Sequence, residues 1–197
     1  PSHVQELKSA NLLLERTVSI LTAARRSSKK SSIIFENPAD RSIADSPCHA
    51  PEFSDHGSIF ATSAFKRLKA SADLTSHCTF AYCTLGSDYQ KYTTLYYTPE
   101  AGSILDMLNN PEFKCNHERG SHAKRAGGRD DTGAFVSAAA AAYPDKLNAI
   151  LAKAFTIART GANIAGSLSH APPTPAAPAP PPTAAQRRDD WWQGLPT

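Results

Sequence analysis

The feature that most constrains the fold of this chain is the segment 33–38, which reads Ile-Ile-Phe-Glu-Asn-Pro. Ile and Phe favour a buried strand, and Pro38 cannot extend a ladder because it lacks a backbone N–H. We therefore expect a parallel strand over 33–37, with Glu36 and Asn37 at its carboxyl end. Open α/β sheets place their ligand chemistry at that edge. The segment thus predicts half of a Rossmann-like domain.

Periodic patterns predict further elements on both sides of this strand. Apolar residues at three- and four-residue steps predict helices over 3–26 and 144–160. We expect further helices over 58–72 and 101–109. β-branched and aromatic residues predict strands over 77–85 and 93–98, which a turn at Gly86 joins into an antiparallel hairpin at the sheet edge. The expected fold class is α/β, a partial Rossmann-like sheet flanked by helices.

Proline content divides the chain into a part that can pack and a part that cannot. Residues 165–197 contain eight of the 15 prolines, within a tract rich in alanine. We therefore expect one partial domain over 1–161 and a disordered Pro/Ala-rich tail or linker over 162–197. A formal net charge of +3 permits contact with nucleic acid but does not require it.

The cysteines and the lengths of the apolar runs indicate the cellular compartment of this chain. The sequence has four irregularly spaced cysteines, no secretory h-region and no run long enough to span a membrane. We expect an intracellular protein, nuclear or cytoplasmic, with reduced thiols and no membrane contact.

A short polar segment holds candidate metal ligands. Cys115, His117 and His122 place a thiolate and two imidazoles within eight residues, a donor set that suits tetrahedral zinc. The segment lacks a fourth ligand, which Cys83, Cys78 or Cys48 has to supply. The spacing matches no standard zinc finger. A basic polar loop with two solvent-exposed histidines is the alternative interpretation.

Three sequence blocks follow one another along the chain: Ile34-Phe35-Glu36-Asn37-Pro38, then Tyr82-Cys83-Thr84-Leu85-Gly86 with Gln90-Lys91-Tyr92-Thr93-Thr94, and finally Ala142-Tyr143-Pro144. Together with the helices around them, over residues 3–160, these blocks resemble in order the C-terminal half of the catalytic domain of DNA cytosine methyltransferases. The chain looks most like the divergent form found in retroelement polyproteins. The resemblance implies a methyltransferase-type sheet.

The resemblance implies roles for individual residues. It implies that the intact parent transfers a methyl group from S-adenosylmethionine to cytosine in DNA. It further implies that Glu36 holds the flipped base and that Asn37 orients the loop. It places Gln90, Lys91 and Thr93 against nucleic acid. The alternative for each is structural: a strand-end acid that meets solvent, and an edge hairpin that binds no nucleic acid.

Two parts of the family pattern are missing from this chain. The Gly-rich loop that binds the methyl donor has no counterpart, and no cysteine precedes Glu36 to serve as the Pro-Cys nucleophile. We therefore expect a truncated, inactive methyltransferase-like domain that lacks its N-terminal half and binds S-adenosylmethionine weakly or not at all. The alternative hypothesis is a non-catalytic module of a retroelement polyprotein. This module binds nucleic acid or protein and is stabilised by zinc through Cys115, His117 and His122.

Overall fold

A computed structural model of the chain describes residues 3–27, 29–118, 120–124, 126, 131–133 and 140–161. The chain divides into two units, Pro1–Asn163 and Ile164–Thr197. All described residues belong to the first unit, so the predicted tail over 162–197 lies outside them. None of the helices among these residues is long and apolar enough to cross a bilayer.

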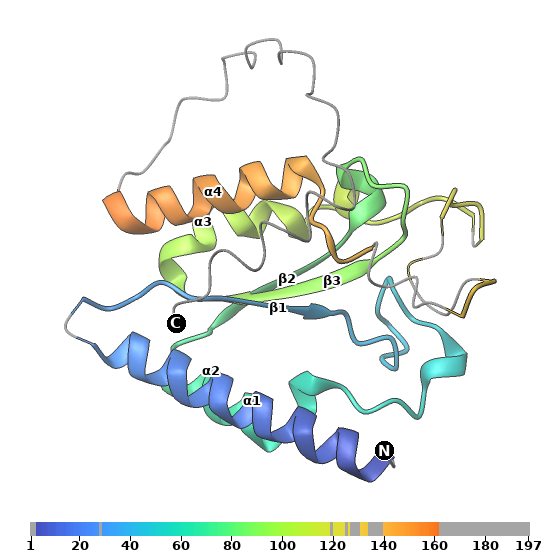
Figure 1. Ribbon diagram of the computed structural model, residues 1–197. Coiled ribbons are helices and arrows are strands. Elements are labelled where there is room, and N and C mark those ends of the chain that lie inside the picture. Colours follow the sequence, from blue (N-terminus) through green and yellow to red (C-terminus); the bar gives the residue numbers. More distant parts are fainter. Residues whose placement is uncertain are drawn as a thin grey trace, which may run out of the picture. The chain divides into compact units, whose positions relative to one another are not determined.

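The described part of the chain is a mixed α/β fold built on a small antiparallel sheet. Its strands are β1 (Ile34–Pro38), β2 (Ser76–Ala81) and β3 (Tyr92–Tyr97), in the order β1-β3-β2. Both neighbouring pairs run antiparallel. Helices α1 (His3–Arg26) and α2 (Ser63–Ser71) lie on one side of the sheet. Helices α3 (Gly102–Leu105) and α4 (Asp145–Thr160) lie on the other side (Figure 1).

The central strand β3 divides the hydrophobic core into two clusters. Successive side chains of a strand point to opposite faces, so Leu95 and Tyr97 face one way and Tyr96 the other. The first cluster packs under α3 and α4 and includes Phe80, Leu95, Tyr97, Leu105, Leu108, Leu147 and Ala154. The second joins α1 and α2 to the sheet and includes Val18, Ile33, Phe65, Leu68 and Leu74, with Phe35, Phe60 and Tyr96 packed against them.

The predicted strand is present as β1, but the prediction that it pairs in parallel is wrong. β1 pairs antiparallel with β3, with Glu36 opposite Leu95 and Pro38 opposite Thr93, so Glu36 lies in the middle of an edge strand rather than at a ligand-binding carboxyl edge. Pro38 ends β1, as its missing N–H requires, and an edge position tolerates it. The described strands therefore do not confirm a Rossmann-like sheet, because such a sheet is built from parallel neighbours.

The predicted hairpin is present, but its position in the sheet differs. β2 and β3 pair antiparallel, yet β3 is the central strand because β1 covers its other side. The expected strand 77–85 stops at Ala81, where a 3₁₀ helix (Tyr82–Leu85) begins. Gly86 follows with φ +92°, a left-handed conformation that favours glycine.

Two helices differ from their predicted spans for local reasons, and a third agrees with its prediction. α2 begins at Ser63 rather than 58 because Thr62 is extended and its hydroxyl accepts a hydrogen bond from the N–H of Phe65. The predicted helix 101–109 is the short α3 followed by a 3₁₀ helix over Asp106–Asn109. α4 matches its predicted span closely and ends at Gly161, which has φ +67°.

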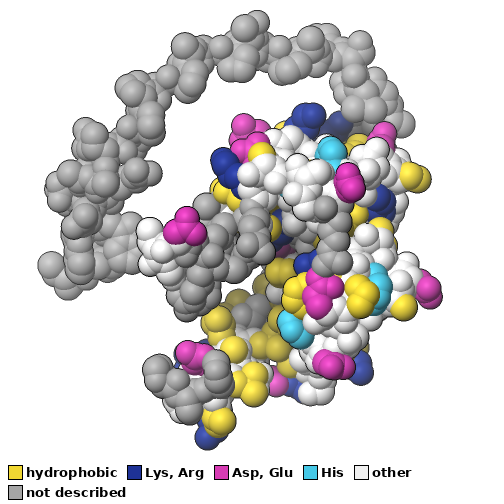
Figure 2. Space-filling model, turned by 90° about the vertical axis from the view of Figure 1, so that its right-hand side faces the viewer, with side chains coloured by type: hydrophobic (Ala, Val, Ile, Leu, Met, Phe, Trp, Pro, Cys, Tyr) yellow, Lys and Arg dark blue, Asp and Glu magenta, His cyan; other side chains and the backbone are white. Residues whose placement is uncertain are grey.

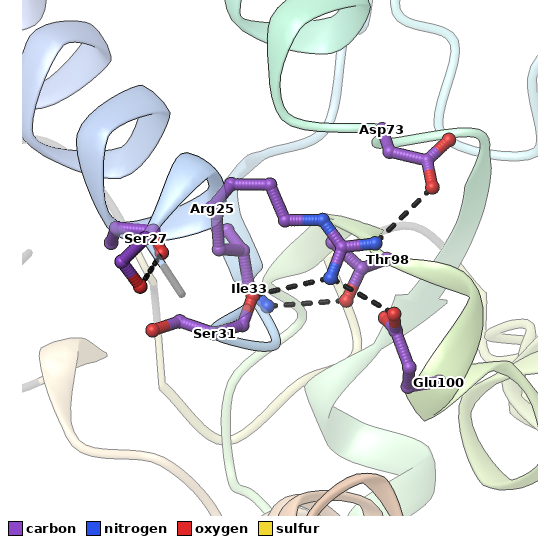
Figure 3. Close-up of polar contacts among 8 residues, drawn as sticks. Arg25, Ser27, Ser31, Ile33, Asp73, Thr98 and Glu100 are labelled. Carbon is purple, nitrogen blue, oxygen red and sulfur yellow. Dashed lines mark hydrogen bonds and ion pairs between the residues drawn. The ribbon is translucent and has the colours of Figure 1, made fainter. Parts of the chain in front are cut away.

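A buried arginine ties the end of α1 to the two loops that flank the sheet (Figure 3). The Arg25 side chain is only 5% exposed. It forms ion pairs with Asp73 at 3.2 Å and Glu100 at 2.9 Å. Beside it, the hydroxyl of Thr98 accepts a hydrogen bond from the N–H of Ile33 at 3.2 Å. These contacts join segments that are far apart in sequence, at the point where α1 leads into β1.

Candidate metal centre

The first candidate ligand, Cys83, lies on the 3₁₀ helix that follows β2. The N–H of Tyr82 donates to Lys91 O at 3.0 Å, so this turn is fastened to the start of β3. Gly86 then adopts a left-handed conformation and closes the turn. The local sequence therefore presents the Cys83 thiol at the end of the β2–β3 hairpin.

The other three candidates lie on a loop whose two ends are anchored to the same hairpin. At its start, the N–H of Cys115 donates to Tyr92 Oη at 3.0 Å, and the Lys114 ammonium donates to carbonyl oxygens of Leu108 and Thr79. At its end, Lys124 Nζ lies 2.8 Å from Asp88 Oδ2. The backbone of Lys124 also bridges to Tyr89. These anchors bring the loop beside Cys83.

Four side chains then meet in one cluster, which we call the metal cluster: Cys83, Cys115, His117 and His122. Their ligand atoms all lie within 4.8 Å of one another. Cys115 Sγ is 3.4 Å from His117 Nδ1 and 3.3 Å from His122 Nε2. Zinc bonds of about 2.3 Å to sulfur and 2.0–2.1 Å to nitrogen make the S–N edge of a tetrahedron roughly 3.6 Å. The observed separations are close to that edge.

The surroundings of the Cys83 thiol disfavour its thiolate form. Burial, together with the neighbouring Cys115 thiol, raises the pKa of Cys83 to about 12. A divalent cation removes this penalty, because zinc binds the thiolate form and displaces the proton. The cluster is half-buried except for His117, which is exposed.

The cluster contains the three predicted ligands and decides which cysteine is the fourth. Cys78 is on β2 within the core, and burial there raises the pKa of its thiol to about 12. Cys48 is buried in a different loop, where its thiol donates to Asp40 O at 3.4 Å. The sequence left Cys83 as one of three candidates for the fourth ligand, because β3, α3 and several 3₁₀ turns separate it from Cys115. Local spacing carries no signal for that contact.

The predicted base-binding and nucleic-acid residues form a second polar group. Glu36 Oε1 lies 3.7 Å from Lys91 Nζ, and Tyr143 donates a hydrogen bond to Glu36 Oε2 at 3.3 Å. The Lys91 ammonium also lies over the Tyr82 ring, 4.8 Å from its centre. Glu36 and Lys91, assigned to separate sites by the resemblance, are therefore engaged with each other.

The remaining predicted residues do not extend this group into an open interface. The Asn37 amide donates to Pro38 O at 3.3 Å and lines a cavity of about 240 Å³. Gln90 lines a cavity of about 330 Å³ together with Lys91. Thr93 is completely buried, so its side chain is not available to a nucleic acid in this conformation.

Glu36→Gln is expected to change stability by less than about 1 kcal/mol, because the carboxylate is partly exposed and its ion pair is long. Burial raises the pKa of Tyr143, and the charge and hydrogen bond of Glu36 raise it further. The variant is therefore expected to lower the pKa of Tyr143, measured by NMR titration of its phenol carbon. Glu112→Gln, at an exposed residue, is the control. An unchanged Tyr143 pKa contradicts the contact, and a large loss of stability indicates a structural role for Glu36.

No protein-family model matches this chain, and neither does any curated protein or solved structure. The likeness to cytosine methyltransferases therefore rests on the three sequence blocks alone. Function has to be inferred from the side chains that the fold brings together.

Proposed function

We propose that this chain is a non-catalytic binding module whose fold is held by a structural zinc ion. The observation that carries the proposal is the convergence of four ligand atoms, two sulfur and two nitrogen, within 4.8 Å. Two thiolates and two imidazoles form a set that prefers zinc over the hard cations Mg²⁺ and Ca²⁺, which bind oxygen.

The zinc would serve structure because four protein ligands complete a tetrahedron. Catalytic zinc sites keep one position open for water or substrate, whereas structural sites are closed by four side chains. The closed site would connect the hairpin turn at Cys83 to the loop 115–122. That loop has few buried apolar residues among those described, so a metal crosslink supplies stability that packing does not.

The geometry supports this hypothesis better than a methyltransferase remnant. To hold a base, Glu36 would need a free carboxylate at the carboxyl edge of a parallel sheet. In this fold Glu36 lies within the antiparallel pairing of β1 with β3, and its carboxylate contacts Lys91 and Tyr143. No described arrangement supports binding of S-adenosylmethionine. The origin in a mobile element stays a hypothesis from the sequence, and so does DNA as a partner.

Native mass spectrometry of the purified chain tests the zinc site. We expect one zinc per chain, retained by Cys48→Ser and lost by Cys83→Ser. Both substitutions replace a thiol by a hydroxyl, so only membership of the metal cluster distinguishes them. His56→Ala, at an exposed histidine outside the cluster, is the matched control for His122→Ala.

Three results would contradict the proposal. Protein free of zinc after expression with added zinc would show that the cluster is only a polar loop. Transfer of labelled methyl groups from S-adenosylmethionine to DNA by the zinc-loaded chain would show that the module is catalytic. Retention of zinc by Cys83→Ser, with loss of zinc in Cys48→Ser, would show that the fourth ligand is Cys48 and not Cys83.

A further inference from the structure

Helix α1 exposes large apolar side chains on the side that faces away from the sheet. Leu12, Leu13 and Ile20 are 54%, 66% and 68% exposed. The opposite side of the same helix is already used, because Leu14, Val18 and Leu21 pack toward α2 and the sheet. In Figure 2, hydrophobic side chains reach the surface at the bottom of the molecule, at the height of α1 in Figure 1. A helix that is apolar on two sides is typical of one buried between its own domain and a partner.

Three hydroxyl groups on α1 donate hydrogen bonds to backbone carbonyl oxygens of the same helix. Ser9 donates to Gln5 O at 3.0 Å, Thr17 to Leu13 O at 2.9 Å, and Ser19 to Glu15 O at 2.9 Å. Because these protons are bonded within the helix, covering this side leaves no unpaired hydroxyl donor. Burial of these three hydroxyl groups therefore costs little polar desolvation.

The charge beside these apolar residues indicates the kind of partner. Arg16 is exposed, and its spacing places it between Leu13 and Ile20 on the helix surface. The adjacent acid Glu15 is held by Arg67, with N–O distances of 2.6 and 2.7 Å. The side therefore presents a basic group to a partner. A second copy in parallel register would bring Arg16 against Arg16, so complementarity favours an acidic partner.

We propose that the side of α1 formed by Leu12, Leu13, Arg16 and Ile20 docks an amphipathic helix of another protein, with acidic residues flanking its apolar seam. Leu13 and Ile20 are seven residues apart, two helical turns or about 10.5 Å, which matches the repeat of apolar anchors in helix–helix recognition. This inference rests on the proposed function as a binding module, but it needs no zinc ligand.

Fluorescence anisotropy with two labelled peptides tests the docking side. Each peptide carries about four heptads with Leu at the seam, flanked by Glu in one and by Lys in the other. We expect the Glu peptide to bind residues 1–197 at least about tenfold more tightly than the Lys peptide. Ile20→Ser and Leu13→Ser should weaken that binding about tenfold. Phe155→Ser removes a 47% exposed side chain from α4 and should leave binding unchanged.

The variant Arg16→Glu distinguishes charge-dependent recognition from nonspecific hydrophobic binding. It should reverse the preference, so that the Lys peptide binds more tightly than the Glu peptide. Four results overturn the proposal: no binding of the Glu peptide, equal binding of the two peptides, binding to anionic phospholipid vesicles in place of the peptide, or a homodimer that Ile20→Ser dissociates. Zinc content is measured on the same samples, so failure of the metal site and failure of the docking side are distinguished.

Discussion

Cys115→Ser is expected to release the zinc ion and to lower the free energy of unfolding by on the order of 4 kcal/mol when free zinc exceeds its Kd about a thousandfold. Cys115 is central to this effect because its sulfur faces both imidazole nitrogens, and its backbone N–H is bonded to Tyr92. Serine keeps the backbone contact and removes only the metal ligand. Urea denaturation with and without zinc measures the loss.

Hydrogen exchange distinguishes a local effect from a global one. In Cys115→Ser, the amides of loop 115–122 should exchange faster, while those of β2 and β3 keep their protection, because the core clusters do not include the loop. A chelator applied to the unmodified chain should reproduce the same pattern. If zinc changes neither the unfolding midpoint nor the exchange of the loop, the cluster does not stabilise the fold.

Arg25→Met is expected to lower the free energy of unfolding by about 2–3 kcal/mol. The arginine is buried, so its loss leaves Asp73 and Glu100 without their shared cation at the end of α1. Both carboxylates are more than one-third exposed, which keeps the expected loss below that of a fully buried pair. Arg26→Met, at the exposed neighbour, is the matched control and should stay within about 0.5 kcal/mol.

The Arg25 ion pairs also predict how stability depends on pH. Burial alone would raise the pKa of Glu100, but hydrogen bonds from its own N–H and from Thr98, together with Arg25, outweigh burial and lower it below 4.5. A depressed carboxyl pKa stabilises the fold above the unfolded value, and this stabilisation is lost as pH falls through the folded value. The difference in unfolding free energy between about pH 7 and about pH 3 should therefore be smaller in Arg25→Met. An equal pH dependence in both proteins would show that Arg25 does not set the Glu100 pKa.

Local sequence was sufficient to place most elements of the described fold. The helices at 3–26 and 144–160 follow from apolar periodicity, and the end of α4 follows from Gly161. The strand at 33–38 follows from its β-branched and aromatic residues and from Pro38. The hairpin follows from the same composition around Gly86.

Tertiary structure alone decided the strand directions and the partners of the candidate residues. Nothing within residues 33–38 states which strand they pair with, and the antiparallel register to β3 moved Glu36 from an expected ligand edge to a contact with Lys91. The local spacing of Cys115, His117 and His122 predicted three metal ligands, while the choice of Cys83 depended on a hairpin turn reaching a distant loop. Periodicity and composition report what a segment buries; long-range pairing depends on how all segments pack at once, which no single segment encodes.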